Sequence, residues 1–401
     1  YKIQLIMIKT LRAFDLQGKN ILIRADFNVP MKGSIVSNNF RIKASLPTIM
    51  TCIEAGAAVV IISHMGRPNG KVDESLSLVP VGEELAGLLE MPIKFSDNCI
   101  SRDAIDTSIS LKSGEIHLLE NLRFHKEEEL NDQEFSSKLA RHGQIYINDA
   151  FGTSHRLHSS NVGVVPFFKN AGIGWLMDKE LKYLDNSMSK PKTPLTIVIG
   201  GAKIDTKLKI LEKFIDKADN IIIGGGMAFT FLKAKGKKVG GSLVDDTMIK
   251  FAKGIMNKAL MKGVKVSLPI DANCANSLDN PLTNGIFSIE KIPDNMMGLD
   301  IGIETLKKYN SILSQSQTIL WNGPMGVFEK KEFETGTRLM ANHLAKCVSN
   351  GAKVIVGGGD TAAALEDYGL IKEMTHVSTG GGASLELLSG NVLPAVMALG
   401  V

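Results

Sequence analysis

The sequence predicts an α/β protein built from two Rossmann-like domains, each a parallel β-sheet flanked by helices. Its 401 residues exceed what one hydrophobic core usually organises, so two domains are expected. Short β-branched runs alternate with helical patterns, as in repeated βα units around buried parallel sheets. The two halves also differ in chemistry, because eight of the nine arginines occur by Arg156 and 26 of the 39 glycines follow residue 190.

The expected strands are apolar runs that end in polar or glycine-rich residues. In chain order they are KNILIRADFN, AAVVIISHMGRP, EIHLLENLRF, QIYINDAFG, PLTIVIGGAK, DNIIIGGGMAF, VKVSLPIDA, TILWNGPMG and AKVIVGGGD. In open α/β sheets, ligands bind outside the carboxyl ends of the strands. The residues that end each run are therefore the candidates for function.

A connecting helix is expected between the two halves. Residues 173–190 carry apolar side chains at helical spacing and are followed at once by Pro191, which stops a helix. We therefore expect a first domain over residues 7–172 and a second domain over residues 191–389.

Composition excludes several classes of protein. The formal charge of +4 is too small and too evenly spread to indicate nucleic acid or a membrane surface as a partner. The four cysteines never form a CxxC pair, which fits a reducing compartment and argues against a zinc site. No apolar run approaches the roughly 18 residues of a membrane span. We expect a cytoplasmic protein.

The first half carries cationic and polar side chains at the ends of its expected strands. Period-two geometry places Arg24, Asp26 and Asn28 on one face after the first strand. The others follow the next loop or later strands: Arg41, His64, Arg67, Arg123, His155 and Arg156. Arginine binds carboxylate and phosphate oxygens bidentately. Several arginines at neighbouring strand ends therefore predict a site for a small polyanion. Taken singly, each arginine is better explained as a surface charge or salt-bridge partner, and each histidine as a structural residue.

Glycine doublets and triplets follow expected strands of the second half at 200–201, 224–226 and 357–359, and a fourth triplet, 380–382, lies in the run STGGGASLELLSG. Such turns let backbone N–H groups close on phosphate oxygens where the next helix begins, although tight turns also use glycine for steric reasons alone. Lys203 and Lys207 add cations that could reach phosphates, and Asp360 could hold Mg²⁺ or simply cap its helix. Residues 357–362 also match a dinucleotide pattern, G-x-G-x-x-A, but that short pattern is weak.

An ordered series of blocks runs along the chain from Arg24 to Gly390, within a resemblance that extends from about Lys9 to Val401. These blocks are RADFNVP, RI, SHMGRP, ENLRF, NDAFGTSHR, GGAKIDTK, GGGMAFTFL, LWNGPMGVFE, GGGDTAAA and STGGGASLELLSG. In them the chain closely resembles the phosphoglycerate kinases. The resemblance implies reversible transfer of the acyl phosphate of 1,3-bisphosphoglycerate to MgADP, which gives 3-phosphoglycerate and MgATP.

The resemblance also implies site residues, carried over by position. The phosphoglycerate site would comprise Arg24 in a supporting role with Asp26, Phe27, Asn28, Arg41, His64, Met65, Gly66, Arg67, Arg123 and Arg156. The nucleotide site would comprise Gly201, Lys203, Lys207, Gly225, Gly298, Asn322, Glu329, Gly358, Gly359, Asp360 and Thr361, with Asp360 also the residue that holds Mg²⁺. The groups around the transferring phosphoryl would be Arg41, Lys207, Gly381 and Gly382.

The family pattern further implies a monomer whose tail, residues 390–401, packs back on the first domain. In-line transfer would follow closure of the domains about the connecting helix. Two other interpretations stay open: an NAD-dependent dehydrogenase built on the pattern at 357–362, and a non-catalytic protein that binds a polyanion or a nucleotide.

Overall fold

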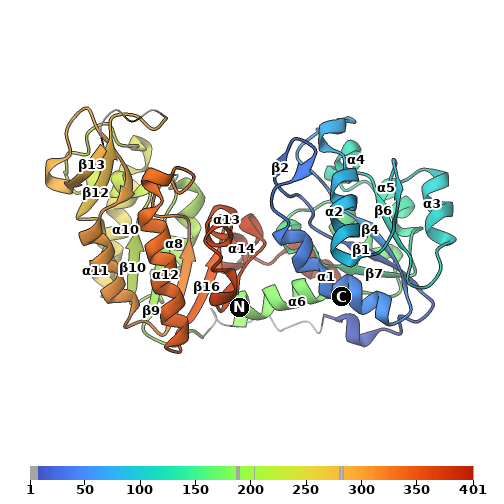
Figure 1. The fold of residues 1–401 in the computed structure, drawn as a ribbon. Helices are drawn as coiled ribbons and strands as arrows, with labels where there is room; N and C mark the ends of the chain where they lie inside the picture. Colours follow the sequence, from blue (N-terminus) through green and yellow to red (C-terminus); the bar gives the residue numbers. More distant parts are fainter. Residues whose placement is uncertain (1–7, 187–189, 203, 280, 282–283, 401) are drawn as a thin grey trace. The chain divides into compact units, whose positions relative to one another are not determined.

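The computed structural model shows two compact units, each a β-sheet with helices packed on it (Figure 1). It describes residues 8–400 except 187–189, 203, 280 and 282–283. Unit 1 takes the chain as far as Lys182 and again from Asn391, and unit 2 comprises Tyr183–Gly390. The predicted α/β class, with two large parallel sheets flanked by helices, is confirmed.

Unit 1 is built on a six-stranded sheet in the order β5-β6-β4-β1-β7-β8, with every pair of neighbours parallel. The strands are β1 (Asn20–Arg24), β4 (Ala58–Ile62), β5 (Ile93–Ser96), β6 (Ile116–Leu119), β7 (Ile145–Asn148) and β8 (Ala171–Ile173). The central run of β4, AVVII, is wholly buried, because a parallel sheet is covered on both faces. A separate hairpin pairs β2 (Met31–Lys32) with β3 (Ile35–Val36).

The helices of unit 1, except the C-terminal helix, follow its strands, as βα units require. They are α1 (Phe40–Glu54), α2 (Val79–Leu89), α3 (Arg102–Ile109), α4 (Lys126–Glu129), α5 (Gln133–Ala140), α6 (Trp175–Leu181) and α15 (Pro394–Leu399). Side-chain caps fix two of their starts: Ser101 Oγ accepts from Ala104 N–H at 3.2 Å, and Asp132 Oδ1 accepts from Phe135 N–H at 2.8 Å.

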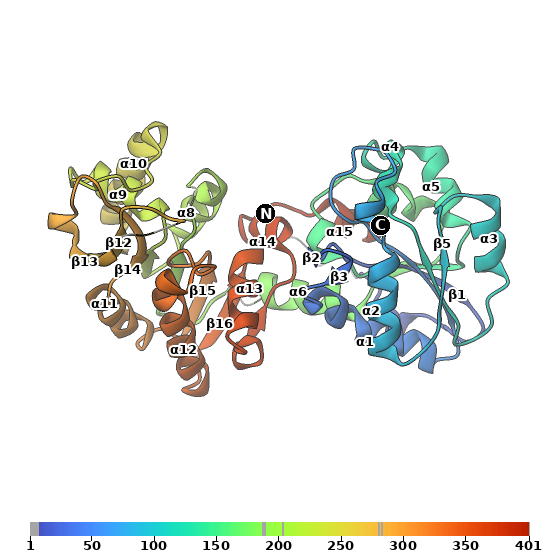
Figure 2. The same ribbon diagram turned by 45° about the horizontal axis from the view of Figure 1, so that its top comes forward.

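Two helical segments lie near the points where the chain passes between the units. Helix α6 continues into a π-helical turn over Lys182–Asn186, and the end of the expected connecting helix lies outside the described residues. The C-terminal helix α15 packs on unit 1 against β8 and the π-helical turn Ser159–Gly163 (Figure 2). Its Ala395 N–H donates to the backbone oxygen of Ser154 at 3.1 Å.

Unit 2 contains a second six-stranded parallel sheet, in the order β11-β10-β9-β15-β16-β17. The strands are β9 (Leu195–Ile199), β10 (Asn220–Ile223), β11 (Lys265–Ser267), β15 (Thr318–Asn322), β16 (Lys353–Gly357) and β17 (His376–Val377). The helices are α8 (Leu208–Phe214), α9 (Met227–Ala234), α10 (Ile249–Lys262), α11 (Ile303–Leu313), α12 (Thr335–Ser349), α13 (Gly359–Asp367) and α14 (Gly381–Leu388). Among the described residues, no helix is both long and apolar enough to cross a membrane.

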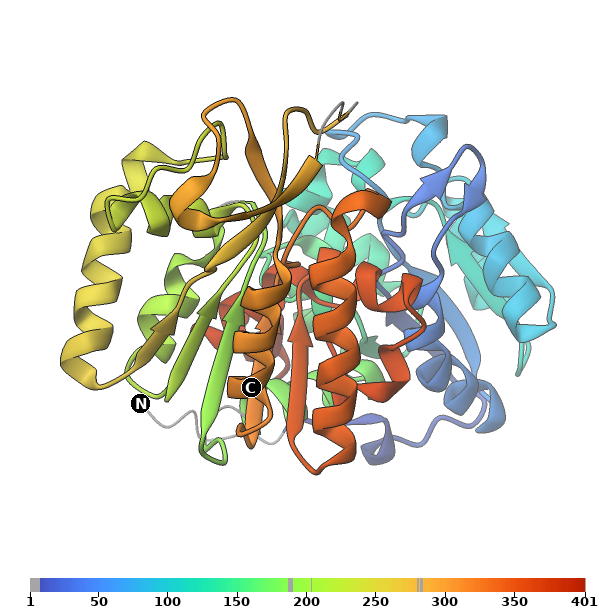
Figure 3. The same cartoon turned by 60° about the vertical axis from the view of Figure 1, so that its left-hand side comes forward.

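A three-stranded antiparallel sheet in unit 2 departs from the simple βα pattern. It pairs β12 (Asp271–Ala275) with β13 (Asn284–Ser288) and β14 (Met297–Ile301), and Figure 3 shows it beyond the ends toward which the parallel strands of the unit point. The expected single strand VKVSLPIDA is therefore wrong. It divides into β11 and β12 around Pro269, because proline has no N–H for a strand ladder.

Candidate functional site

The carboxyl ends of the unit 1 strands meet at one edge of the sheet. Strand pairing sets Arg24, the last residue of β1, beside Ile62 of β4 and Asn148 of β7. The residues predicted to bind an anion follow these ends, as parallel strands dictate. We call this the arginine edge, after its members Arg24, Arg41, Arg67, Arg123 and Arg156.

Hydrogen bonds tie the loop after β1 to the loop after β4. Gly66 N–H donates to Asn28 Oδ1 at 2.9 Å. Arg41, in the first turn of α1, donates from Nη1 to the backbone oxygen of Asn28 at 2.8 Å and lies 3.4 Å from Asp26 Oδ1. Its side chain keeps 25% of its surface exposed, so the guanidinium can still reach a ligand.

Asn121 stabilises the loops of the arginine edge by hydrogen bonds, although the sequence reasoning did not assign it a role. Its Oδ1 accepts from the backbone N–H groups of Met65 (3.1 Å) and Arg123 (3.0 Å), and its Nδ2 donates to the backbone oxygens of Met65 and Leu76. Arg123 Nη1 in turn donates to the Gly66 oxygen at 2.6 Å. Asn121 lies inside the block ENLRF, so its position in that block was the available signal.

The pKa values of the edge show that its cations lie close together. Burial first, and then the charges of the neighbouring Arg156 and Arg24, lower the pKa of Arg123 to about 10. Burial also lowers the pKa of Arg156, with Arg67 the next cause. The pKa of His64 lies well below its ordinary value because of burial first and then of four guanidiniums, those of Arg24, Arg123, Arg156 and Arg41. Such a concentration of like charge fits a small polyanion as its ligand.

His158 also borders the arginine edge and was missed by the sequence reasoning. Burial, followed by the charges of Arg24 and Arg123, lowers its pKa to about 3. It comes two residues after Arg156 in the sequence, and that proximity is the only signal that could have identified it.

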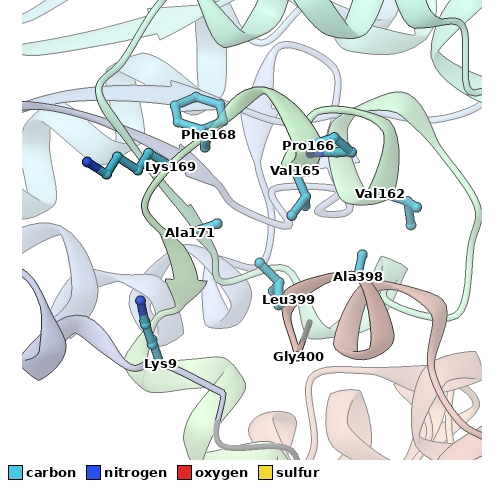
Figure 4. A pocket seen from close by; sticks show the side chains of 10 residues that line it. All are labelled: Lys9, Val162, Val165, Pro166, Phe168, Lys169, Ala171, Ala398, Leu399 and Gly400. Atoms are coloured by element: carbon cyan, nitrogen blue, oxygen red, sulfur yellow. The ribbon is translucent and has the colours of Figure 1, made fainter.

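Unit 1 also holds an open cavity away from these residues (Figure 4). The cavity measures about 610 Å³ and is lined mainly by apolar side chains, with Lys9 and Lys169 at one side. Its apolar walls come from Val165, Phe168 and Leu399, among others. None of the predicted site residues lines it, so it is not part of the candidate site.

The glycine turns of unit 2 bring backbone into close contact with backbone. Gly225 has φ +63°, and a Cβ there would lie 2.4 Å from the nitrogen of Gly201. Gly323 has φ +96°, and its Cβ would lie 2.2 Å from the oxygen of Gly200. The four predicted turns, 200–201, 224–226, 357–359 and 380–382, follow β9, β10, β16 and β17, and we call this the glycine edge.

The turns of the glycine edge differ in how their amide groups are used. Gly201 N–H donates to the Pro324 oxygen at 2.8 Å, and Gly225 N–H donates to the Met325 oxygen at 3.0 Å. These two turns therefore use amides to hold the segment after β15. The N–H groups at the start of α13 and α14 have no partner within their own helices, because the first turn of a helix never does.

A polar cluster lies where β15 meets α13. Lys207 Nζ donates to Asn322 Oδ1, and Thr361 Oγ1 accepts from Gly323 N–H at 2.8 Å. Burial lowers the pKa of Lys207, and the charge of Asp360 opposes that change. Asn322 Nδ2 is buried without a hydrogen-bond partner among the described residues. Lys203, the other predicted lysine, lies outside the described residues.

Asp360 fits a magnesium site that is completed by phosphate. It is exposed in the first turn of α13, beside Thr361 and the helix amides. No group of three or more His, Cys, Asp or Glu side chains that could hold a metal occurs in the described part of the chain. A single carboxylate is enough here, because Mg²⁺ usually keeps several waters and binds through one or two carboxylates plus phosphate oxygens.

One of the predicted nucleoside residues, Gly225, lines a small and mainly apolar cavity of unit 2. Gly225, Phe229 and Met325 line it, together with residues of β14. Gly298 packs directly on this wall, since a Cβ there would lie 1.9 Å from Phe229 Cζ. Glu329 is exposed in the segment that follows β15.

These two edges define the class of protein. An α/β chain with clustered guanidiniums on one unit, and helix amides, a lysine and a carboxylate on the other, is equipped for phosphoryl transfer to a small anion. The chain belongs to the phosphoglycerate kinase family, because the model of that family, described as phosphoglycerate kinase, matches residues 11–391.

Relatives and solved structures agree over nearly the whole chain. Phosphoglycerate kinase of Thermosynechococcus vestitus is 46% identical over 393 residues, which are 98% of each chain. The chloroplastic enzyme of Volvox carteri is 47% identical over 96% of this chain and 84% of its own. The structure of phosphoglycerate kinase from Coxiella burnetii matches with a TM-score of 0.85 at 38% identity over 98% of both chains. That from Pyrococcus horikoshii matches with 0.86 at 32% identity, over 97% of this chain and 98% of its own.

Proposed function

We propose that this chain is an enzyme that transfers the acyl phosphate of 1,3-bisphosphoglycerate to MgADP, reversibly, giving 3-phosphoglycerate and MgATP in glycolysis and gluconeogenesis. The observation that carries the proposal is the arginine edge, because its clustered guanidiniums need an anion to neutralise them. Membership of the phosphoglycerate kinase family supports the same substrate.

The arginine edge binds the phosphoglycerate. Arg67 is exposed and Arg156 is half-buried, as Arg41 is, and Arg67 and Arg156 take the phosphate and carboxylate oxygens. Phe27, Met65 and Gly66 shape the floor through their backbone, with Asn28 holding Gly66. Arg24 is fully buried and supports its neighbours without contact to the ligand.

The glycine edge binds the nucleotide. The first-turn amides of α13, at Gly358 to Thr361, take phosphate oxygens, as helix N-termini do. Gly225, Gly298, Asn322 and Glu329 border the nucleoside, with Glu329 on the ribose. Mg²⁺ on Asp360 supplies neutralisation of the nucleotide phosphates when it is bound.

Transfer needs alignment and charge neutralisation more than a base. The acceptor carboxylate of 3-phosphoglycerate is already ionised, so no side chain has to remove a proton. Arg41, Lys207 and the amides of Gly381 and Gly382 surround the transferring phosphoryl after the two units close about the segment 173–190. Water is excluded at the same step.

The chain acts as a monomer in the cytoplasm. The arginine edge and the glycine edge both lie within one chain, so no second copy is needed to supply either. Relatives include bacterial and chloroplastic proteins, so sedimentation and localisation in the source cell test this part directly.

A coupled assay tests the activity. ATP-dependent phosphorylation of 3-phosphoglycerate is followed through an auxiliary dehydrogenase that consumes NADH as the acyl phosphate forms. We expect turnover that depends on both substrates and on Mg²⁺. Binding without turnover would select a non-catalytic polyanion-binding protein, and reduction of NAD with a hydroxy acid would select the dehydrogenase.

Arg41→Ala tests the role of the arginine edge in turnover. We expect kcat to fall by at least 100-fold, about 2.7 kcal/mol of transition-state stabilisation, with ADP affinity nearly unchanged. Arg102→Ala is the matched control, because that guanidinium is 90% exposed and its ion pair in the described part of the chain is with Asp106 on its own helix. Near-normal kcat of Arg41→Ala at saturating substrates would contradict the assignment.

A further inference from the structure

A chain of buried hydrogen bonds runs behind the arginine edge. Arg24, Glu128 and Ser160 have no exposed surface. Arg24 Nε lies 2.8 Å from Ser160 Oγ, and Ser160 Oγ lies 2.6 Å from Glu128 Oε1. Ser160 N–H also donates to Glu128 Oε2 at 2.9 Å. Tyr146 donates its hydroxyl to the Ser160 backbone oxygen at 2.6 Å, which fixes the serine from the other side.

The direction of each hydrogen bond follows from the donors available. A guanidinium can only donate, so the Ser160 hydroxyl accepts from Arg24 and gives its single proton to Glu128. Glu128 thus accepts from Ser160 through both oxygens and acts as a carboxylate. Burial raises the pKa of Glu128, and the Arg24 charge and the Ser160 donors oppose that rise. His158 Nδ1 lies 3.7 Å from Glu128 Oε1, beyond hydrogen-bonding distance.

At its other end, this series of hydrogen bonds reaches His64. Arg24 Nη2 lies 3.2 Å from His64 Nδ1, and because the guanidinium donates, Nδ1 accepts. The ring is then neutral and carries its proton on Nε2. Arg24 Nη1 donates to the backbone oxygen of Ala25, so each nitrogen of this guanidinium has a protein partner.

We propose that Glu128 and Ser160 are positioning residues for the phosphoglycerate: they hold Arg24 so that it keeps His64 in the Nε2–H tautomer, with that N–H as a donor to the ligand. The inference rests on the proposed function. Neither Glu128 nor Ser160 contacts the ligand, because both are buried behind Arg24.

There is a physical reason for placing Ser160 between the charges of Arg24 and Glu128. A carboxylate bonded directly to Arg24 would bring its negative charge closer to the bound anion, and repulsion between like charges falls with distance. With the hydroxyl in between, Glu128 compensates the buried guanidinium from further away. The positive charge of Arg41, Arg67 and Arg156 stays available to the phosphoglycerate.

Nitrogen NMR of the full-length wild-type chain tests the tautomer first. A long-range ¹H–¹⁵N correlation spectrum at pH 7 should show a neutral His64 with its proton on Nε2. A proton on Nδ1, or an imidazolium, would overturn the proposal without any variant.

Ser160→Ala tests the series of hydrogen bonds from Glu128 through Ser160 to Arg24, with Ser159→Ala as the matched control. Ser159 is equally buried and adjacent, but its hydroxyl bonds, within the described residues, to the backbone oxygens of Glu127 and Asp132 and not to Arg24 or Glu128. We expect Ser160→Ala to raise KM for 3-phosphoglycerate roughly tenfold, the loss of one hydrogen bond to a charged group, with KM for MgATP unchanged. His64 should then populate both tautomers, whereas Ser159→Ala should keep one.

Two outcomes would contradict the positioning role of Ser160 and Glu128. One is a Ser160→Ala variant with wild-type KM for 3-phosphoglycerate and an unchanged His64 spectrum; the other is a Ser159→Ala variant that changes both as strongly. Absence of turnover in the wild-type chain would instead contradict the proposed function, so the two failures are distinguishable. If Ser160→Ala does not fold, a wild-type His64 with its proton on Nδ1 would still overturn the proposal.

Discussion

Gly323 and Gly351 form a matched pair that separates backbone strain from steric contact. Both have positive φ, +96° and +95°. A Cβ at Gly323 would lie 2.2 Å from the oxygen and 2.4 Å from the carbon of Gly200, whereas nothing lies within 4 Å of a Cβ at Gly351. Alanine at either position therefore meets the same backbone penalty, and only at Gly323 does it also meet the backbone of the neighbouring turn.

The expected magnitudes follow from this difference. The left-handed conformation costs an L-residue about 1–2 kcal/mol, so Gly351→Ala should lower the free energy of unfolding of unit 2 by that amount. Gly323→Ala should lose about 1–3 kcal/mol more, because overpacking against backbone cannot be relieved by a change of rotamer. The shift would also disturb Thr361, which accepts from Gly323 N–H, so KM for MgATP should rise only in Gly323→Ala.

Fluorescence during urea unfolding measures this effect. The chain has two tryptophans, Trp175 in unit 1 and the fully buried Trp321 in unit 2. In a Trp175→Phe background, Trp321 alone reports the unfolding of unit 2. Equal losses of stability in Gly323→Ala and Gly351→Ala, or a wild-type midpoint for Gly323→Ala, would refute the reasoning.

Two further substitutions test a buried histidine of unit 1 and the metal site of unit 2. His142 has a pKa lowered to about 4 by burial, below its ordinary 6.5, so the unfolded chain binds more protons between these values and stability is lost as pH falls through that window. His142→Gln should therefore reduce the loss of unfolding free energy between pH 7 and pH 4 by about 3 kcal/mol, measured by urea titration at both pH values; an unchanged loss would contradict the buried neutral ring. Asp360→Asn should raise the Mg²⁺ concentration needed for half-maximal turnover at least tenfold, with KM for 3-phosphoglycerate unchanged, and an unaltered Mg²⁺ requirement would place the metal elsewhere.

The fold class could be predicted because it depends on local patterns. The run AVVII is fully buried and NILIR is buried except for its first residue, and such β-branched, buried runs indicate a sheet covered on both faces. The order β5-β6-β4-β1-β7-β8 could not be read from the same runs, because it depends on how the helices pack between them. The antiparallel sheet was missed for a similar reason: Pro269 divides one apolar run into strands of two different sheets.

The candidate site shows the same division. Positions of single residues at strand ends, such as Arg41 and Asp360, follow from the order of the sequence. Their partners are distant in sequence and come together only through packing. Asn121 contacts Met65, 56 positions away, and Ser160 lies 136 positions from Arg24. The glycine turns likewise look equivalent in sequence. In two of them, however, backbone N–H groups donate to backbone oxygens of the segment after β15.

Amide chemical-shift mapping of the full-length chain tests the central claim most directly, that the arginine edge takes the phosphoglycerate. Titration with 3-phosphoglycerate alone should produce its largest shifts in unit 1, at residues 24–28, 64–67, 121–124 and 155–158. The signals of residues 358–361 and 381–383 should stay in place until MgADP is added. Shifts confined to the glycine edge, or none at millimolar 3-phosphoglycerate, would contradict the account.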